Sequence, residues 1–262
     1  MQRTVEDFAK MRLDVGGMLD PKVYHELYLS ARQSAHNILE IGTARGAATV
    51  ALGLGALDGG HENVRVATVE KLGESYTERY GTPEDYRARL YGAFERYGVA
   101  ERIDVHFGAA RAIVSDPVIE AGLGLMFLDA DGALDRDFSD FYGALVPGAA
   151  IIIDDYGTDR ATLYINPTEI KIDQKHRLTK LLVHYFEEKG VLRKDQVVKE
   201  TYFGARPDGA TFEPNADEIF QVYRELTFSD AKLSSAAYVN SSRLLKKISP
   251  SFHLWLKTQL GK

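Results

Sequence analysis

The sequence contains no cysteine. The chain can therefore form no disulfide bond, offer no thiolate nucleophile and hold no zinc ion through sulfur. Any bound metal ion must have oxygen or imidazole ligands. The sequence also lacks any stretch approaching about 18 consecutive apolar residues, and its N-terminus lacks the apolar core of a signal peptide. We therefore expect a cytoplasmic protein without an integral membrane segment.

An excess of positive charge is absent as well. The 38 acidic residues outnumber the 32 lysines and arginines, which gives a formal net charge of -6. Because proteins bind nucleic acids largely through the phosphates, this charge argues against a nucleic-acid partner. With 262 residues, of which 45% are hydrophobic, the chain can bury a large core. These properties favour a protein that acts on a small molecule, and we expect a homodimer.

Short apolar runs alternate with longer amphipathic segments along most of the chain. This order is typical of a mostly parallel sheet that is covered by helices on both faces. It predicts a doubly wound α/β fold with an extra C-terminal helical segment. Strands are expected at 38–41, 64–69, 103–107, 125–129, 149–153 and 196–204, and helices at 21–36, 46–56, 83–97, 135–145, 171–189 and over most of 215–262.

Acidic residues stand where four of these strands end. They are Glu40, Glu70, Asp129 and the pair Asp154 and Asp155. In open α/β sheets, ligands bind beyond the carboxyl ends of the strands, so these side chains should gather in one crevice.

The first of these strand ends lies in the sequence ILEIGTARG, residues 38–46. Gly42 and Gly46 allow the backbone to approach a ligand closely, because no Cβ intervenes. The sequence lacks the G-x-G-x-x-G pattern that cradles a pyrophosphate. A nicotinamide-dependent oxidoreductase is therefore a weaker alternative.

Three segments together carry a resemblance to a known family. They are ILEIGTARG, VATVEK at 66–71, and LMFLDADGALDRDF followed by LVPGAAIIIDDY between 125 and 156. In this order they resemble the class I S-adenosylmethionine-dependent methyltransferases, especially the catechol-type and natural-product sugar O-methyltransferases. The resemblance covers roughly residues 15–157 and implies a Rossmann-like, seven-stranded sheet. It also implies a helical lid at 1–36, a cofactor-binding domain at 37–210 and a helical appendage at 211–262.

The resemblance assigns roles to the acidic strand ends. The Glu40 carboxylate would hydrogen-bond the ammonium group of S-adenosylmethionine, directly or through water. Glu70 would accept hydrogen bonds from the ribose hydroxyls, and the adenine would lie near the start of the segment 108–110. The complete predicted cofactor set is Glu40, Gly42, Thr43, Gly46, Glu70, Lys71, Gly108, Ala109, Ala110 and Asp129.

Asp129, Asp154 and Asp155 match the three magnesium-binding positions of the catechol-type enzymes. Carboxylate oxygens suit Mg²⁺, which would draw in two substrate oxygens and make the attacking hydroxyl more acidic. The alternative is that these acids only line the pocket, as in metal-free relatives, with Asp155 capping a turn.

The catalytic base of the catechol-type enzymes is missing. Their lysine stands three residues after the first aspartate, where this chain has Gly132, and other relatives have histidine there. A base must then come from elsewhere if the metal does not suffice. The predicted catalytic residues are Asp129, Asp131 and His25, with Asp135, His176 and His184 as further candidates. His25 is equally explained as a packing residue of the lid helix, and Asp131 and Asp135 as helix caps.

These features predict an S-adenosylmethionine-dependent O-methyltransferase that acts on a hydroxyl of a small molecule, with Mg²⁺ as an expected second cofactor. Four aromatic residues beyond the last acidic pair favour a phenolic or sugar-containing acceptor: Tyr156, Tyr164, Tyr202 and Phe203. The alternatives are a metal-independent methyltransferase acting on nitrogen or another acceptor, the oxidoreductase, and a non-catalytic protein that retains the fold. The basic segment 241–262 is predicted to pack on its own domain or on a second subunit rather than on a membrane.

Overall fold

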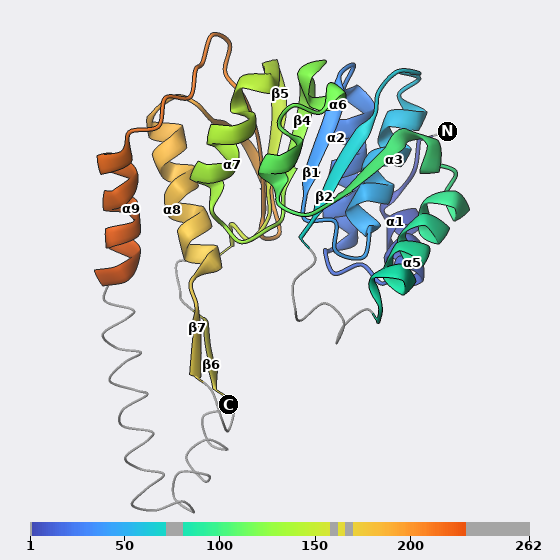
Figure 1. Ribbon diagram of the computed structural model, residues 1–262, viewed down its shortest axis with the longest axis horizontal. Helices are drawn as coiled ribbons and strands as arrows, with labels where there is room; N and C mark the ends of the chain where they lie inside the picture. Colours follow the sequence, from blue (N-terminus) through green and yellow to red (C-terminus); the bar gives the residue numbers. More distant parts are fainter. Residues whose placement is uncertain (1, 72–80, 158–161, 166–169, 229–262) are drawn as a thin grey trace, which may run out of the picture.

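The computed structural model describes residues 2–71, 81–157, 162–165 and 170–228. Its centre is a seven-stranded sheet (Figure 1). Strand β9 is antiparallel to both of its neighbours, and the other neighbouring pairs are parallel. The predicted mostly parallel, seven-stranded sheet is thus confirmed. From one edge to the other the strands are β3 (Ile103–Phe107), β2 (Val66–Glu70), β1 (Asn37–Ile41), β4 (Leu123–Leu128), β5 (Leu145–Ile153), β9 (Thr201–Ala205) and β8 (Arg193–Val198).

Helices cover both faces of this sheet (Figure 1). One face carries α1 (Val5–Val15), α2 (Pro21–Gln33), α3 (Ala47–Asp58) and α5 (Pro83–Arg96). The other carries α6 (Pro117–Glu120), α7 (Leu134–Phe141) and α8 (Lys175–Glu188), with α9 (Ala216–Phe228) packed against α8. Short 3₁₀ helices lie at Ala100–Arg102, Ala110–Ile113 and Tyr142–Ala144, and β6 (Thr162–Ile165) pairs antiparallel with β7 (Ile170–Asp173) in a separate sheet.

Alternate residues of each central strand point into two different hydrophobic cores. In β4, Phe127 packs with the helices of the first face, while Met126 and Leu128 pack with those of the second. In β5, Ile152 joins the first core, and Ile151 and Ile153 join the second. Both faces of these strands are buried, which explains why they appear in the sequence as continuous apolar runs.

The second half of the chain differs from the prediction in its details. The strand predicted at 196–204 is a hairpin of β8 and β9, which turns at Lys199 with φ of 59°. Strand β8 reads RKDQVV and is largely exposed at the sheet edge, so it has no apolar pattern to reveal it. The helix predicted from 171 begins only at Lys175, because β7 ends at Asp173.

Two predicted helical regions differ in extent from the observed helices. The helix predicted at 135–145 ends at Phe141, where a 3₁₀ turn leads into β5. Helix α9 lies within the predicted C-terminal appendage, whereas residues 229–262, including the basic segment 241–262, lie outside the described residues. Among the described helices, none combines the length and apolar character needed to cross a bilayer.

Candidate functional site

The turn between β1 and α3 packs directly onto the end of β4. Gly42 has φ of +108°, and a Cβ at this position would overlap the carbonyl oxygen of Asp129. The Asp129 N–H in turn donates to the Ile41 carbonyl over 2.9 Å. Gly46, with φ of +80°, then begins α3. Both predicted glycines are therefore required by the backbone itself, because only glycine enters this region readily.

Glu40 is completely buried beneath this turn. Its Oε2 accepts hydrogen bonds from the hydroxyls of Thr49 (2.5 Å) and Thr68 (2.6 Å). Its Oε1 has no hydrogen-bond partner among the described residues. Burial raises the pKa of Glu40 to about 8, although the two hydroxyls oppose the shift. Glu40 thus connects β1 with α3 and β2, and its contact with the cofactor ammonium stays a prediction.

Glu70 holds the same turn from the neighbouring strand. Its Oε2 accepts a 2.7 Å hydrogen bond from the Ala44 N–H, and burial raises the pKa of its carboxyl group. The Gly108 N–H donates to the Glu70 carbonyl over 2.9 Å. The ends of β2 and β3 therefore bring Glu70 and Gly108 together, and their contacts with the ribose and the adenine stay predictions. Lys71 is exposed, and Ala109 precedes the 3₁₀ helix that begins at Ala110.

A small pocket lies in front of the turn. It is lined by residues 17–19, by Tyr24 of α2, by residues 42–45 and by Asp129. The Tyr24 hydroxyl accepts a 3.1 Å hydrogen bond from the Leu19 N–H, which fixes the segment between α1 and α2 beside the pocket. Neither Tyr24 nor this segment was assigned to the site from the sequence, although the predicted lid contains both.

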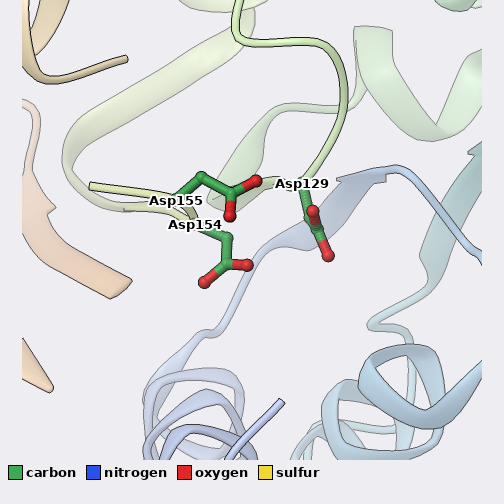
Figure 2. Close-up of side chains that lie close together, drawn as sticks. All are labelled: Asp129, Asp154 and Asp155. Carbon is green, nitrogen blue, oxygen red and sulfur yellow. The ribbon is translucent and has the colours of Figure 1, made fainter. Parts of the chain in front are cut away.

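The three predicted metal ligands lie together at the ends of β4 and β5. Figure 2 shows the carboxylate of Asp129 on one side of a small space and those of Asp154 and Asp155 on the other. One carboxylate oxygen of each lies within 4.8 Å of the others. The Asp154 N–H donates to the Leu128 carbonyl over 2.9 Å, which holds the two strand ends side by side. Asp155 adopts a left-handed conformation with φ of 61°, which aspartate tolerates better than most residues.

The crowding of these carboxylates changes their protonation. Burial, together with the charge of Asp129, raises the pKa of Asp154 to about 7, although the Thr201 hydroxyl donates to it over 2.5 Å. Burial also raises the pKa of Asp129. Three partly buried acids at one place are stable in ionised form only beside a cation.

A lysine from α8 supplies positive charge at this cluster. The Lys175 ammonium contacts the Asp155 carboxylate and lies 3.5 Å from Asp129 Oδ1. Next to it, His176 Nε2 lies 3.3 Å from Asp155 Oδ1. His176 was a candidate base from the sequence, whereas Lys175 was not singled out. Nothing in the local sequence indicates that the first turn of α8 reaches the ends of β4 and β5.

The remaining acidic base candidates have other partners. Asp131 forms two hydrogen bonds with Arg136, of 2.9 and 3.0 Å, and these lower the pKa of Asp131. It also caps the turn at Ala133. Asp135 accepts a 2.8 Å hydrogen bond from the Tyr223 hydroxyl. A carboxylate with a lowered pKa is a weak proton acceptor, so the structural explanation of Asp131 fits its contacts better than the catalytic one.

The other two histidines are placed differently from His176. His25 packs between the rings of Phe8 and Tyr28, with ring centroids 5.9 and 6.3 Å away. His184 is half exposed, and its Nδ1 lies 3.4 Å from Glu187 Oε2. Within the described part of the chain, neither has a hydrogen bond or an ion pair to the three aspartates. Their catalytic roles stay predictions, and the packing explanation of His25 accounts for its contacts.

The aromatic residues predicted to line the acceptor pocket belong instead to the cores. Tyr202 is fully buried and its hydroxyl donates to Glu187 over 3.0 Å. Phe203 and Tyr156 are 5% and 7% exposed. Tyr202 and Phe203 are enclosed because β9 is an internal strand of the sheet, whereas Tyr156 follows β5 and packs in the second core. Tyr164 lies in β6, where side chains are outside the described part of the structure.

Solved structures with a similar fold include methyltransferases. The O-methyltransferase TomG of Streptomyces achromogenes, involved in tomaymycin synthesis and solved with S-adenosylmethionine, is 19% identical, with a TM-score of 0.51 over 78% of this chain and 89% of its own. An O-methyltransferase of Bacillus cereus with S-adenosylhomocysteine is 18% identical, with a TM-score of 0.53 over 77% and 90%. The S-adenosylhomocysteine-bound methyltransferase PaMTH1 of Podospora anserina is 18% identical, with a TM-score of 0.54 over 78% and 87%.

The chain has the fold of these methyltransferases. The sheet order agrees with this likeness, because an antiparallel strand, β9, lies between β5 and β8. The dinucleotide-binding fold has parallel strands in the order 3-2-1-4-5-6 instead. No family model matches the sequence, and no curated protein matches it significantly.

Proposed function

We propose that this chain is an S-adenosylmethionine-dependent O-methyltransferase that acts on a hydroxyl group of a small molecule. One observation carries the proposal. Asp129 both lines the pocket in front of the β1–α3 turn and belongs to the three-aspartate cluster. A cofactor bound at the turn and an acceptor bound at the cluster would therefore meet at one residue, as transfer of a methyl group requires.

The cofactor would be held by the ends of β1, β2 and β3. Gly42 and Thr43 line the pocket and would face the methionine part of the cofactor. The Glu70 carboxylate, already fixed by the Ala44 N–H, is placed to accept the ribose hydroxyls. Gly108 follows β3 and would leave space for the adenine. These binding groups are already held in place by the protein, which lowers the entropic cost of binding the cofactor.

The cluster fits a divalent cation by the chemistry of its ligands. Asp129, Asp154 and Asp155 provide hard oxygen atoms within 4.8 Å of one another, and burial, followed by the charge of Asp129, raises the pKa of Asp154. These three residues would hold Mg²⁺, which when bound would lower the pKa of an acceptor hydroxyl. Thr201 orients Asp154 through its 2.5 Å hydrogen bond.

Catalysis would depend on positioning. The nucleophilic oxygen must lie in line with the sulfonium methyl group, and good alignment of two reactants supplies on the order of 7–11 kcal/mol of the barrier. The strand ends of β4 and β5 are rigid, because both are central strands whose flanking residues are fully buried. Asp129 and Asp154 directly follow these two strands, so the proposed acceptor site is built on the buried core of the sheet.

Calorimetry with S-adenosylhomocysteine tests the cofactor assignment. We expect binding by the wild-type chain and no comparable binding of NAD⁺. A labelled-methyl assay with phenols, catechols and sugars, each with and without Mg²⁺, then identifies the acceptor class. Preference for NAD⁺ would overturn the proposal in favour of the oxidoreductase, and cofactor binding without transfer to any hydroxyl or amine would favour a non-catalytic protein. A homodimer, a cytoplasmic location and the lack of a nucleic-acid partner stay predictions from the sequence.

A further inference from the structure

We infer that Lys175 is a built-in competitor of the divalent cation: its ammonium group occupies the aspartate cluster when the metal is absent and must leave when the metal binds. The inference rests on the proposed function, because it concerns the metal site of that function. It adds a residue that controls how tightly the site holds its ion.

The first support is the position of the ammonium group. It contacts Asp155 and lies 3.5 Å from Asp129 Oδ1, so it bridges carboxylates that come from two different strands. These are two of the three groups that would hold Mg²⁺. A carboxylate oxygen that is paired with the ammonium group is not available to a metal ion. The two cations therefore compete for the same ligands.

The second support is how the lysine reaches this place. Lys175 is the first residue of α8, and its side chain passes over Gly132. A Cβ at Gly132 would lie 3.3 Å from Lys175 Cγ and 3.2 Å from Thr179 Oγ1, which is closer than ordinary packing allows. Gly132, with φ of +82°, thus gives α8 the room to approach.

The charges around the cluster explain why the Lys175 ammonium group is stable there and why a divalent ion can replace it. Three carboxylates face Lys175 and the neighbouring His176, whose Nε2 lies 3.3 Å from Asp155 Oδ1. A single positive charge only partly compensates three acids. A divalent ion brings more charge to the same oxygens, while Lys175 has a long side chain at the partly exposed first turn of α8 and is able to move away.

Binding of Mn²⁺ by calorimetry, measured on the full chain in the presence of S-adenosylhomocysteine, tests the inference. We expect Lys175→Met to bind Mn²⁺ at least about tenfold more tightly than the wild type, because one charge at contact distance from the ligands is removed. Lys175→Arg keeps a competing cation and should bind as weakly as the wild type. Lys180→Met is the matched control for general charge, since Lys180 lies on the same helix, over the ring of Tyr156.

A second measurement avoids the variants. Isotopic dimethylation of wild-type lysines, read by mass spectrometry, should modify Lys175 faster after Mn²⁺ is added, whereas Lys180 serves as an internal reference. Four results would each overturn the inference. The wild type and Lys175→Met bind Mn²⁺ equally tightly, or neither of them binds it. Lys175→Met and Lys180→Met gain the same Mn²⁺ affinity, or the modification rate of Lys175 does not change when Mn²⁺ is added.

These outcomes are separate from those of the proposed function. If the chain transfers methyl groups but Lys175→Met has an unchanged Mn²⁺ affinity, the inference is rejected and the proposed methyltransferase function stands. If that variant binds Mn²⁺ more tightly but the chain has no affinity for S-adenosylhomocysteine, the competition by Lys175 is supported and the proposed methyltransferase function is rejected.

Discussion

The carbonyl oxygen of Asp129 occupies the space that a Cβ of residue 42 would need, so Gly42 and Asp129 join the β1–α3 turn to the end of β4. One glycine thereby connects the proposed cofactor pocket with the proposed metal cluster. The contact is between main-chain atoms, which makes it insensitive to side-chain movement and sensitive to any substitution of the glycine.

Gly42→Ala should lower the free energy of unfolding by about 3 kcal/mol, because alanine is strained at a φ of +108° and would collide with the Asp129 carbonyl. Urea denaturation measures the change. Gly92→Ala is the matched control: its Cβ would meet nothing within 4 Å in α5. It should stabilise the chain by about 0.5–1 kcal/mol. Similar effects of both substitutions would contradict the proposed role of Gly42.

Glu40 should make the stability of the chain depend on pH. Its pKa is about 8 in the folded chain and near the ordinary 4.5 in the unfolded one. Below that ordinary value both states are protonated. As the pH rises toward the folded pKa, only the unfolded state loses its proton, so the folded state is progressively destabilised. The substitution Glu40→Gln removes this pH-dependent destabilisation of the folded state.

The stability of Glu40→Gln relative to the wild type should therefore rise between pH 5 and pH 7, by up to about 1.4 kcal/mol per pH unit. Urea titrations at pH 5, 6 and 7 measure it. Glu95→Gln, at an exposed position of α5, should leave the difference constant. A constant difference for Glu40→Gln as well would show that Glu40 is ionised in the folded chain.

Glu70→Ala should weaken S-adenosylhomocysteine binding by about 10- to 100-fold, since a charged acceptor of hydrogen bonds is removed. It also removes the 2.7 Å bond that fixes the Ala44 N–H. Calorimetry measures the affinity, with the exposed Glu95→Ala as control. Lys71→Ala in the same series tests the neighbouring sequence prediction. An unchanged affinity in Glu70→Ala would remove the ribose role of this residue.

Tyr24→Phe should raise the dissociation constant for S-adenosylhomocysteine by about fivefold, which corresponds to one ordinary hydrogen bond. The lost bond is the one from the Leu19 N–H, which fixes the segment beside the pocket. Tyr91→Phe, at a side chain that is 42% exposed, provides the control. If both variants bind alike, residues 17–19 do not act as part of a lid.

Removal of divalent ions by chelation should reduce methyl transfer, and added Mg²⁺ should restore it, while S-adenosylhomocysteine binding stays the same. The reason is that the three aspartates, of which Asp129 lines the pocket, would hold the ion beside the proposed acceptor site. Asp155→Asn should weaken the response to Mg²⁺. Full activity after thorough chelation would favour the metal-independent alternative and leave the cofactor assignment intact.

The sequence predicted β1, β2, β4 and β5 with their acidic residues correctly, because each contains an apolar run with a carboxylate at or next to its end. Asp129, Asp154 and Asp155 were placed together for the same reason: adjacent parallel strands end at one edge. Only the second half of β8 fell within the predicted strand 196–204, because the first half is polar and exposed. The buried positions of Tyr202 and Phe203 depend on the antiparallel pairing of β9, which local sequence does not encode.

Local sequence by itself determined the order of strands and helices, the glycine turn and the acids at the strand ends, since hydrophobic runs and turn residues act over a few neighbours. Only the tertiary structure decided what surrounds those acids. Thr49 and Thr68 reach Glu40, and Lys175 reaches Asp129 across 46 residues of chain. Such contacts follow from how helices pack on the sheet, and packing brings together side chains whose separation along the chain gives no sign of it.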